Sequence, residues 1–217
     1  MNRISSLLLS LLLLLGCAVT SSAQDAKTCF LEMPDSLSLL SAVSRADCID
    51  FLENKMKAEV TNRLGSKSEM KVLTESYILL QSTPQSTWQM KLLPVSKKKQ
   101  VICVISTACA PACDSHIRFY STDWQELNAQ KYLSELPTVE DFLQVPSDTA
   151  ATSSYQESRR QADITLLKAE LSANENCLHF ILTTPDYMEK SQADKLRPYL
   201  KQQLTYQWMK KKFLPKE

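Results

Sequence analysis

Four successive segments between residues 71 and 120 carry the side-chain pattern of β-strands, and this run restricts the fold more than any other feature. Trp88, Met90 and Leu92 alternate with polar residues, as in a half-buried strand. Residues 101–106 are continuously apolar or β-branched, which predicts a central strand covered on both faces. Because the connections are short, the simplest arrangement is an antiparallel meander. The four segments are residues 71–81, 87–92, 101–106 and 116–120.

Helices are expected before this run of strands. Residues 35–64 have helical spacing, with apolar side chains in two successive stripes. Ser44, three residues before Asp47, resembles the start of a capping box, which favours two short helices over one long helix. Gly65 suits the left-handed conformation in which many helices end.

The chain changes character after residue 136. Residues 137–142 fit one helical turn, whereas residues 146–160 are polar and rich in Ser and Thr, which is typical of a loop or linker. Order is expected to resume with strands at residues 164–171 and 177–183, a helix at residues 191–201 and a last strand at residues 204–208. For the last segment, a continuing helix is the alternative.

This order of elements predicts an α+β fold, with N-terminal helices, an antiparallel four-strand meander and a second β-β-α-β portion after a polar linker. The predicted organisation is a signal peptide at 1–23, helices plus four strands at 24–136, the linker at 137–160 and the second α+β portion at 161–217. Whether the second portion belongs to the same domain stays open.

The first residues have the layout of a signal peptide, with Arg3 before an apolar run that ends at Cys17. The run is shorter than the roughly 20 residues that a membrane-spanning helix needs. Small residues before Gln24 fit ordinary cleavage there, which gives an exported, periplasmic protein. The alternative is a lipobox at residues 14–17, which would anchor the protein to a membrane through an acylated Cys17.

Charge and glycine content exclude two classes of function. Without Arg3, the remaining chain has equal numbers of basic and acidic residues, so nucleic acid is not an expected partner. The lysine triplets at 97–99 and 210–212 adjoin expected strands, where lysines solvate turns and edges. Gly65 is the one glycine left after processing, which excludes glycine-rich nucleotide-binding loops.

No motif points to catalysis, a metal or a cofactor. The two histidines, His116 and His179, lie in expected strands without the spacing of a metal site, and no nucleophile elbow is present. We therefore expect a non-catalytic module that binds a macromolecular partner in the envelope or assists assembly. The alternative is a periplasmic hydrolase whose site forms only in three dimensions. A deep pocket holding a histidine beside an acid or nucleophile would favour the hydrolase, and an exposed sheet face or groove the binding module.

Six cysteines remain after processing, and an even set in an oxidising compartment favours disulfides. Cys109 and Cys113 flank an Ala-Pro-Ala turn between two expected strands, which places them opposite each other in a hairpin and predicts a structural disulfide. Two unpaired thiols and a redox-active pair are the alternatives. The pairing of the others stays open; they are Cys29, Cys48, Cys103 and Cys177.

Several segments resemble a family of exported proteins from Bacteroidales that is catalogued as a domain of unknown function. The matching segments are residues 33–37, 49–52, 56–62, 65–70, 90–94, 101–103 and 114–124. The resemblance spans nearly the whole mature chain and implies a location in the envelope of a Gram-negative anaerobe, but it supplies no activity, cofactor, site residue or oligomeric state. Such proteins need not carry cysteines around the turn before Asp114, which favours a structural role for Cys109 and Cys113.

Overall fold

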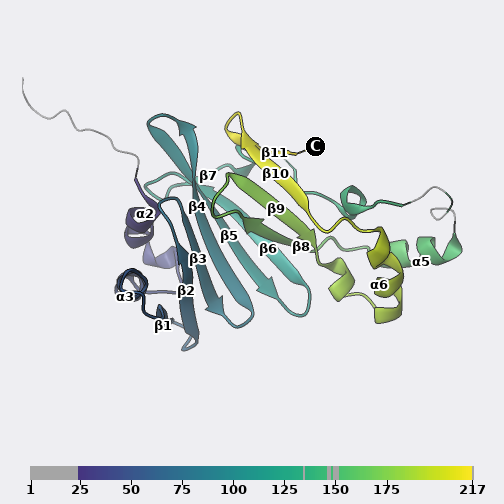
Figure 1. The fold of residues 1–217 in the computed structure, drawn as a ribbon, viewed down its shortest axis with the longest axis horizontal. Helices are drawn as coiled ribbons and strands as arrows, with labels where there is room; N and C mark the ends of the chain where they lie inside the picture. The colour runs from purple at the N-terminus through teal and green to yellow at the C-terminus, as the bar shows by residue number, and fades with distance from the viewer. Residues whose placement is uncertain (1–23, 134, 146–147, 149–151, 217) are drawn as a thin grey trace, which may run out of the picture.

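The computed structural model describes residues 24–133, 135–145, 148 and 152–216 and consists of two antiparallel sheets with helices at both ends (Figure 1). The first sheet, in both chain and spatial order, comprises β1 (Glu59–Thr61), β2 (Lys67–Leu73), β3 (Tyr77–Thr83), β4 (Ser86–Ser96), β5 (Lys99–Cys109), β6 (Cys113–Tyr120) and β7 (Glu126–Leu127). The second sheet comprises β8 (Leu167–Leu171), β9 (Cys177–Leu182), β10 (Leu204–Met209) and β11 (Lys212–Pro215), in the spatial order β11-β10-β9-β8. The expected α+β class is confirmed.

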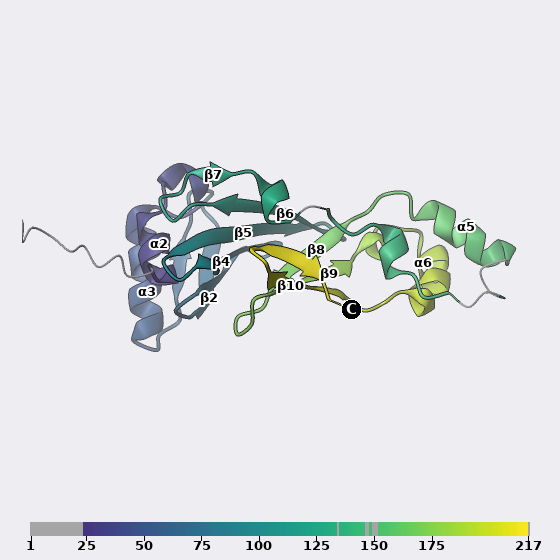
Figure 2. The ribbon, with the colours of Figure 1, turned by 90° about the horizontal axis from the view of Figure 1, so that it is seen from above.

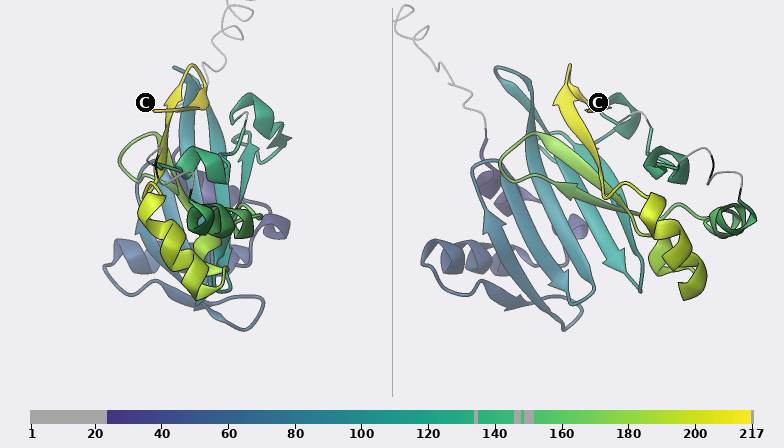
Figure 3. Two further views of the ribbon diagram at one scale, coloured as in Figure 1. Left: turned by 90° about the vertical axis from the view of Figure 1, so that its right-hand side faces the viewer. Right: turned by 45° about the vertical axis from the view of Figure 1, so that its right-hand side comes forward.

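The helices precede and follow the first sheet. The α-helices are α2 (Ala26–Glu32), α3 (Ala42–Glu53), α5 (Ser153–Gln161) and α6 (Lys190–Leu196). Short 3₁₀ segments are η2 (Asp35–Leu37), η3 (Ala129–Lys131), η4 (Val139–Phe142), η5 (Thr184–Asp186) and η6 (Arg197–Tyr199). The views from above and from the side place α2 and α3 at one end of the molecule and α5 and α6 at the other (Figures 2 and 3).

The meander is longer than the four strands expected. Residues 71–81 are not one strand but the end of β2, a reversal and β3, because the Thr74 hydroxyl accepts a hydrogen bond from the Tyr77 amide at 3.0 Å and closes a turn. The short edge strands β1 and β7 were also missed. Strands of two or three residues leave too few positions for alternation to be recognised.

The N-terminal helices differ from the expected ones in position. The first, α2, lies before residue 35, and α3 begins after Ser41, whose hydroxyl accepts a hydrogen bond from the Ser44 amide at 3.1 Å. Ser41, not Ser44, is therefore the N-cap. Gly65 does adopt a left-handed conformation, with φ of 77°, but in the turn between β1 and β2 and not at a helix end.

The polar stretch at 146–160 is not a loop throughout, because its second half forms α5. The Thr152 hydroxyl caps this helix by accepting a hydrogen bond from the Tyr155 amide. Ser158 is buried on α5 and donates to Gln192 of α6 at 2.8 Å, so the two helices pack together. The expected helical turn at 137–142 appears as η4.

The end of the chain is a hairpin, so the strand interpretation of residues 204–208 is confirmed over the helical alternative. Lys210 and Lys211 adopt positive φ in the turn between β10 and β11, and Lys97 and Lys98 form the turn between β4 and β5. The lysine triplets therefore solvate turns, as expected. The preceding helix α6 stops at Leu196, before the turn η6 that contains Pro198.

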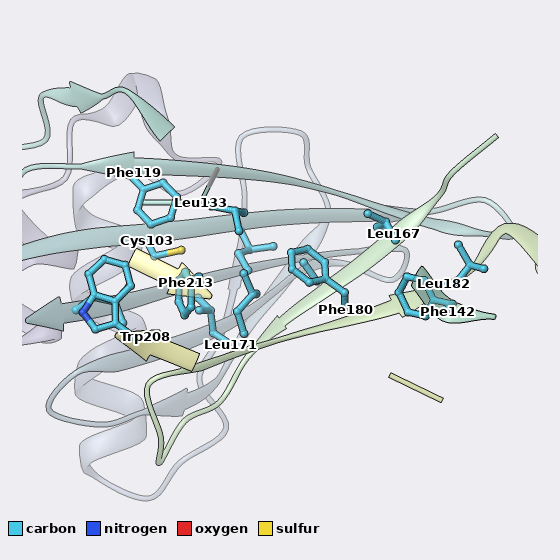
Figure 4. Packing of buried hydrophobic residues seen from close by; sticks show 14 of the residues in the cluster. Cys103, Phe119, Leu133, Phe142, Leu167, Leu171, Phe180, Leu182, Trp208 and Phe213 are labelled. Atoms are coloured by element: carbon cyan, nitrogen blue, oxygen red, sulfur yellow. The ribbon is translucent and has the colours of Figure 1, made fainter. Parts of the chain in front are cut away.

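The second sheet lies against one face of the first, and aromatic and aliphatic side chains from both fill the space between them (Figures 3 and 4). Cys103 and Phe119 come from the first sheet, while Phe180, Trp208 and Phe213 come from the second. Residues before and after the polar stretch therefore share one hydrophobic cluster. Removing apolar surface from water stabilises the folded state by about 25 cal/mol per Å², so this cluster is the main source of the free energy that holds the two sheets together.

Side chains of the first sheet also bind the open edge of β8. The backbone amide of Leu171 donates to Gln89 at 2.9 Å, and that of Ala169 donates to Ser115 at 2.9 Å. Lys91 is buried and donates from Nζ to the carbonyl oxygens of residues 172 and 173. These bonds satisfy main-chain groups that an edge strand would otherwise leave open, and they fix how the second sheet crosses the first.

Candidate functional site

The opposite face of the first sheet is only partly covered. Helices α2 and α3 pack on it through a second cluster that includes Phe30, Ile49, Ile78 and Met90. Beyond these helices, the face of β4, β5 and β6 near the Cys109–Cys113 hairpin stays open. A groove runs between this open face and residues 36–39, which connect α2 to α3.

The floor of the groove contains one row of side chains that crosses three strands. Trp88 of β4 pairs with Ser106 of β5, and Ser106 pairs with His116 of β6. Ser106 and His116 are exposed, and Trp88 is half-buried against Phe30 with ring centroids 5.7 Å apart. Because side chains two residues apart share a face, Asp114 and Arg118 flank His116 on the same side of β6.

Arg45 of α3 holds the wall of the groove in place. Its guanidinium is 2% exposed and donates to the Leu40 carbonyl at 2.9 Å and the Met33 carbonyl at 2.6 Å, on either side of the wall. It also binds the Asp35 carboxylate at 2.9 Å, which pairs on its exposed side with Arg63 at 2.8 Å. A guanidinium presents several donors in one rigid plane, so Arg45 fixes the wall at several points at once.

The groove comprises two adjoining hollows, a larger one of about 530 Å³ and a smaller one of about 250 Å³. They share five residues, which are Ser36, Leu37, Trp88, Ser106 and His116. The larger hollow extends toward Asp114 and the hairpin, and the smaller toward Arg118. The larger one falls within the range of small-ligand sites.

Hydroxyl groups and apolar surface alternate around the larger hollow. Six serines are among its described lining residues, and these are Ser36, Ser38, Ser82, Ser86, Ser106 and Ser115. Leu37, Leu39 and Ala108 add apolar surface beside Trp88. Asp114 is the one carboxylate among the described lining residues, and neither Lys nor Arg is among them. The groove can therefore offer hydrogen bonds and apolar contact to one ligand.

His116, Ser106 and Asp114 are not joined to one another by hydrogen bonds within the described part of the chain. His116 makes no hydrogen bond to either residue there, although Ser106 lies directly opposite on β5. The Asp114 carboxylate instead accepts a hydrogen bond from the Leu167 amide at 3.3 Å. In hydrolases with a nucleophile, a base and an orienting acid, these groups lie within hydrogen-bond reach of one another, and the contacts are often longer without substrate.

The two histidines lie on opposite faces of the molecule. Leu178 and Phe180 point into the core between the sheets, so His179, between them on β9, faces outward. Its Nδ1 is 3.0 Å from the Thr205 hydroxyl, beside a separate polar hollow of about 570 Å³. No cluster of three or more potential metal ligands occurs among the residues that the structure describes.

Cys109 and Cys113 form a disulfide at the tip of the β5–β6 hairpin, with Cα atoms 3.9 Å apart. The intervening Ala110–Pro111 peptide bond is cis. Neighbouring Ala108 and Asp114 line the larger hollow, so the disulfide lies next to one end of the groove but is not among the residues that line it.

The other four described cysteines are buried and unpaired, so the even count does not translate into three disulfides; they are Cys29, Cys48, Cys103 and Cys177. Burial raises the pKa of Cys29 and of Cys48 to about 11, and it also raises the pKa of Cys103. These thiols therefore stay protonated at neutral pH and are poor nucleophiles. Cys17 lies outside the described residues.

The wall and its arginine were missing from the sequence-based expectations. An arginine within a helical segment is ordinarily solvent-exposed, and nothing local distinguishes Arg45 from Arg63. The one available signal is position, since Arg45 lies in the first turn of α3, where it can reach back to the chain before the helix. Its burial depends on how residues 31–40 fold over it.

The chain is similar to a protein family and to a solved structure whose descriptions state no function. A family model described as "Protein of unknown function (DUF3256)" matches residues 18–213. A solved structure described as "Structure of a domain of an uncharacterized protein from Porphyromonas gingivalis W83" is 24% identical, with a TM-score of 0.77, and the match covers 89% of this chain and 100% of that one. At this identity, the likeness concerns the fold alone.

No curated protein matches the chain. Within the described residues, none of the helices has the length and apolar character needed to cross a membrane.

Proposed function

This chain belongs to the DUF3256 family, whose function is unknown, and from the groove of this member we propose that it is an exported, non-catalytic module that binds a macromolecule of the cell envelope. The observation that carries the proposal is an open groove with a fixed wall and an exposed floor. Ser106 and His116 are exposed there, while Arg45 anchors the wall.

A groove whose wall is already anchored suits binding. Ordering side chains and loops on association costs roughly 0.5–1.5 kcal/mol per immobilised side chain, and a wall held by a buried guanidinium avoids part of that cost. The groove also extends across neighbouring strands, since its two adjoining hollows share Trp88, Ser106 and His116. An extended ligand can therefore lie in it, whereas an enclosed pocket would admit only a small molecule.

Export is supported by Arg3, by the apolar run ending at Cys17 and by the Cys109–Cys113 disulfide, which suits an oxidising compartment. We place the mature N-terminus at Gln24 and the protein in the periplasm. Acylation at Cys17 is the alternative, and it would attach the protein to a membrane. Mass spectrometry of the native protein tests this proposal: a chain starting at Gln24 supports it, and an acylated Cys17 refutes the periplasmic form.

A hydrolase is the second candidate, because Ser106 and His116 pair across neighbouring strands within the groove. The missing hydrogen bonds in the described structure and the engagement of Asp114 by Leu167 favour binding over catalysis. A fluorophosphonate probe separates the two. Covalent labelling of Ser106 that His116→Ala abolishes would establish the hydrolase, and absence of labelling at Ser106 is the expected result.

Capture from envelope extracts tests the binding function. Immobilised protein is compared with Ser106→Arg, which fills the groove floor, and with Ser191→Arg, the same change at an exposed position on α6. We expect the wild type and Ser191→Arg to retain the same envelope component and Ser106→Arg to lose it. If all three proteins retain the same material, the groove is not the binding site.

A further inference from the structure

We propose that the ligand of the groove is an uncharged saccharide chain, an inference that rests on the binding function proposed above. The lining residues carry the argument, because they combine hydroxyl groups, an aromatic ring and a single carboxylate. Each alternative class of ligand leaves one of these features unmatched.

The hydroxyl groups match a ligand rich in hydroxyls. A serine side chain both donates and accepts hydrogen bonds, as a sugar hydroxyl does. Ser36 is exposed at the wall and Ser106 at the floor, so the ligand meets such groups from both sides. A purely apolar ligand would bury these hydroxyls without partners, at a cost of roughly 1–3 kcal/mol for each group.

The aromatic and aliphatic side chains match the C–H faces of sugar rings. Trp88 is half-buried at one end of the row that crosses the floor, and it belongs to both hollows. Leu37 faces it from the wall and is also shared by both hollows. A sugar ring carries hydroxyls around its edge and C–H groups on its faces, so one ring can satisfy Trp88, Leu37 and the flanking serines together.

The charges disfavour an anionic ligand. The described lining of the larger hollow holds the Asp114 carboxylate and neither Lys nor Arg. A phosphate or carboxylate in the larger hollow would be repelled by Asp114, and no Lys or Arg of the described lining there would offset this repulsion. Asp114 can instead accept hydrogen bonds from ligand hydroxyls, and such charge-assisted bonds are stronger than neutral ones. Arg118 lines only the smaller hollow.

A peptide added as a further strand does not fit this floor. Strands β4 and β5 are paired on both sides. At the hairpin end of β6, the Cys113 carbonyl accepts a hydrogen bond from the Thr183 hydroxyl, and β7 pairs with the other end. A peptide in the groove would thus lie on a sheet face and not along a strand edge, where its backbone could pair with the sheet.

Titration followed by backbone-amide NMR tests the ligand class. The probes are tetrasaccharides of β-1,4-linked glucose, α-1,4-linked glucose, mannose and N-acetylglucosamine, with an uncharged Ser- and Leu-containing peptide beside them. We expect at least one tetrasaccharide to shift the amides of residues 36–39, 88, 106 and 116, and the peptide to shift none. Binding of the peptide with no response to any saccharide would overturn the proposal.

Variants place the saccharide in the groove. Trp88→Ala removes the ring and should weaken binding by about tenfold or more. Because Trp88 also packs on Phe30, Asp114→Asn provides a second variant that keeps an oxygen to accept the Leu167 amide. This change should weaken the same saccharide severalfold, and Ser191→Arg should leave its affinity unchanged. If all three variants bind the saccharide with the affinity of the wild type, the saccharide does not bind at the proposed site.

Treatment of the captured envelope material separates failure of the ligand class from failure of the function. Periodate cleaves sugar diols, and protease cleaves protein. We expect periodate to abolish retention on the wild-type protein and protease to leave it intact; for 1,4-linked N-acetylglucosamine, which lacks internal vicinal diols, a matching glycosidase replaces periodate. If retention depends on Ser106 but is destroyed only by protease, the groove still binds an envelope component but the saccharide proposal is wrong. If retention does not depend on Ser106, the binding function itself fails.

Discussion

Replacing Arg45 with Met should loosen the groove wall and destabilise the protein. The change removes a buried guanidinium that binds the Met33 and Leu40 carbonyls. Each carbonyl left without a donor inside the protein costs about 1–3 kcal/mol. Methionine fills part of the space, and the penalty for burying the arginine charge disappears, so we expect a net loss of about 3 kcal/mol. For a chain of this length, that is a fall in Tm of about 6–12 °C.

Arg63→Met is the matched control, because Arg63 binds the same Asp35 from the outside. The side chains of Arg63 and Asp35 are 44% and 50% exposed, so this ion pair should contribute less than about 1 kcal/mol. Differential scanning calorimetry measures both variants, and hydrogen exchange follows the amides of residues 36–40. If Arg45→Met melts within about 2 °C of Arg63→Met, or those amides exchange no faster than in the wild type, Arg45 does not hold the wall.

Three further predictions concern the cysteines and the buried lysine. Replacing Cys109 and Cys113 with Ser should lower the free energy of unfolding by only about 2 kcal/mol, because the disulfide closes a short loop. The change should leave saccharide binding intact. Calorimetry measures the first effect and titration the second. Cys29 and Cys48, with pKa values near 11, should resist iodoacetamide at neutral pH until the protein is unfolded; fast labelling of the native protein would contradict their burial. Burial lowers the pKa of Lys91 in the folded protein below the ordinary 10.5. At pH values between these two pKa values, the unfolded chain binds more protons than the folded one, so the free energy of unfolding rises with pH. Chemical denaturation at several pH values should show a smaller rise for Lys91→Met than for the wild type.

The strands could be predicted where one face is buried along many residues. Residues 101–105 lie in the centre of the first sheet and are buried on both faces, as their continuous apolar pattern predicted, whereas Ser106 at the end of the predicted segment is exposed. Helix α5 was missed because its composition is polar, and its order depends on contacts such as Ser158 to Gln192, which are 34 residues apart. Local pattern carries no information about such a partner.

The site was predictable in part. The alternation around His116 placed its side chain on one face of a strand, and the hairpin spacing predicted the disulfide partner of Cys109. The sequence could not predict that residues 36–39 form the wall of the groove. Whether the face of β6 is open or buried depends on where residues 36–39 pass, and their path is set by long-range bonds to Arg45.

Covalent labelling of the two histidines tests the groove as the binding site most directly. Since they lie on opposite faces, His116 reports on the groove and His179 is the internal control. Diethyl pyrocarbonate modification is measured at each residue by mass spectrometry, with and without the captured envelope component. We predict that the component protects His116 and leaves the labelling of His179 unchanged. Unchanged labelling of His116 in the saturated complex, or protection of His179 alone, would contradict binding in the groove.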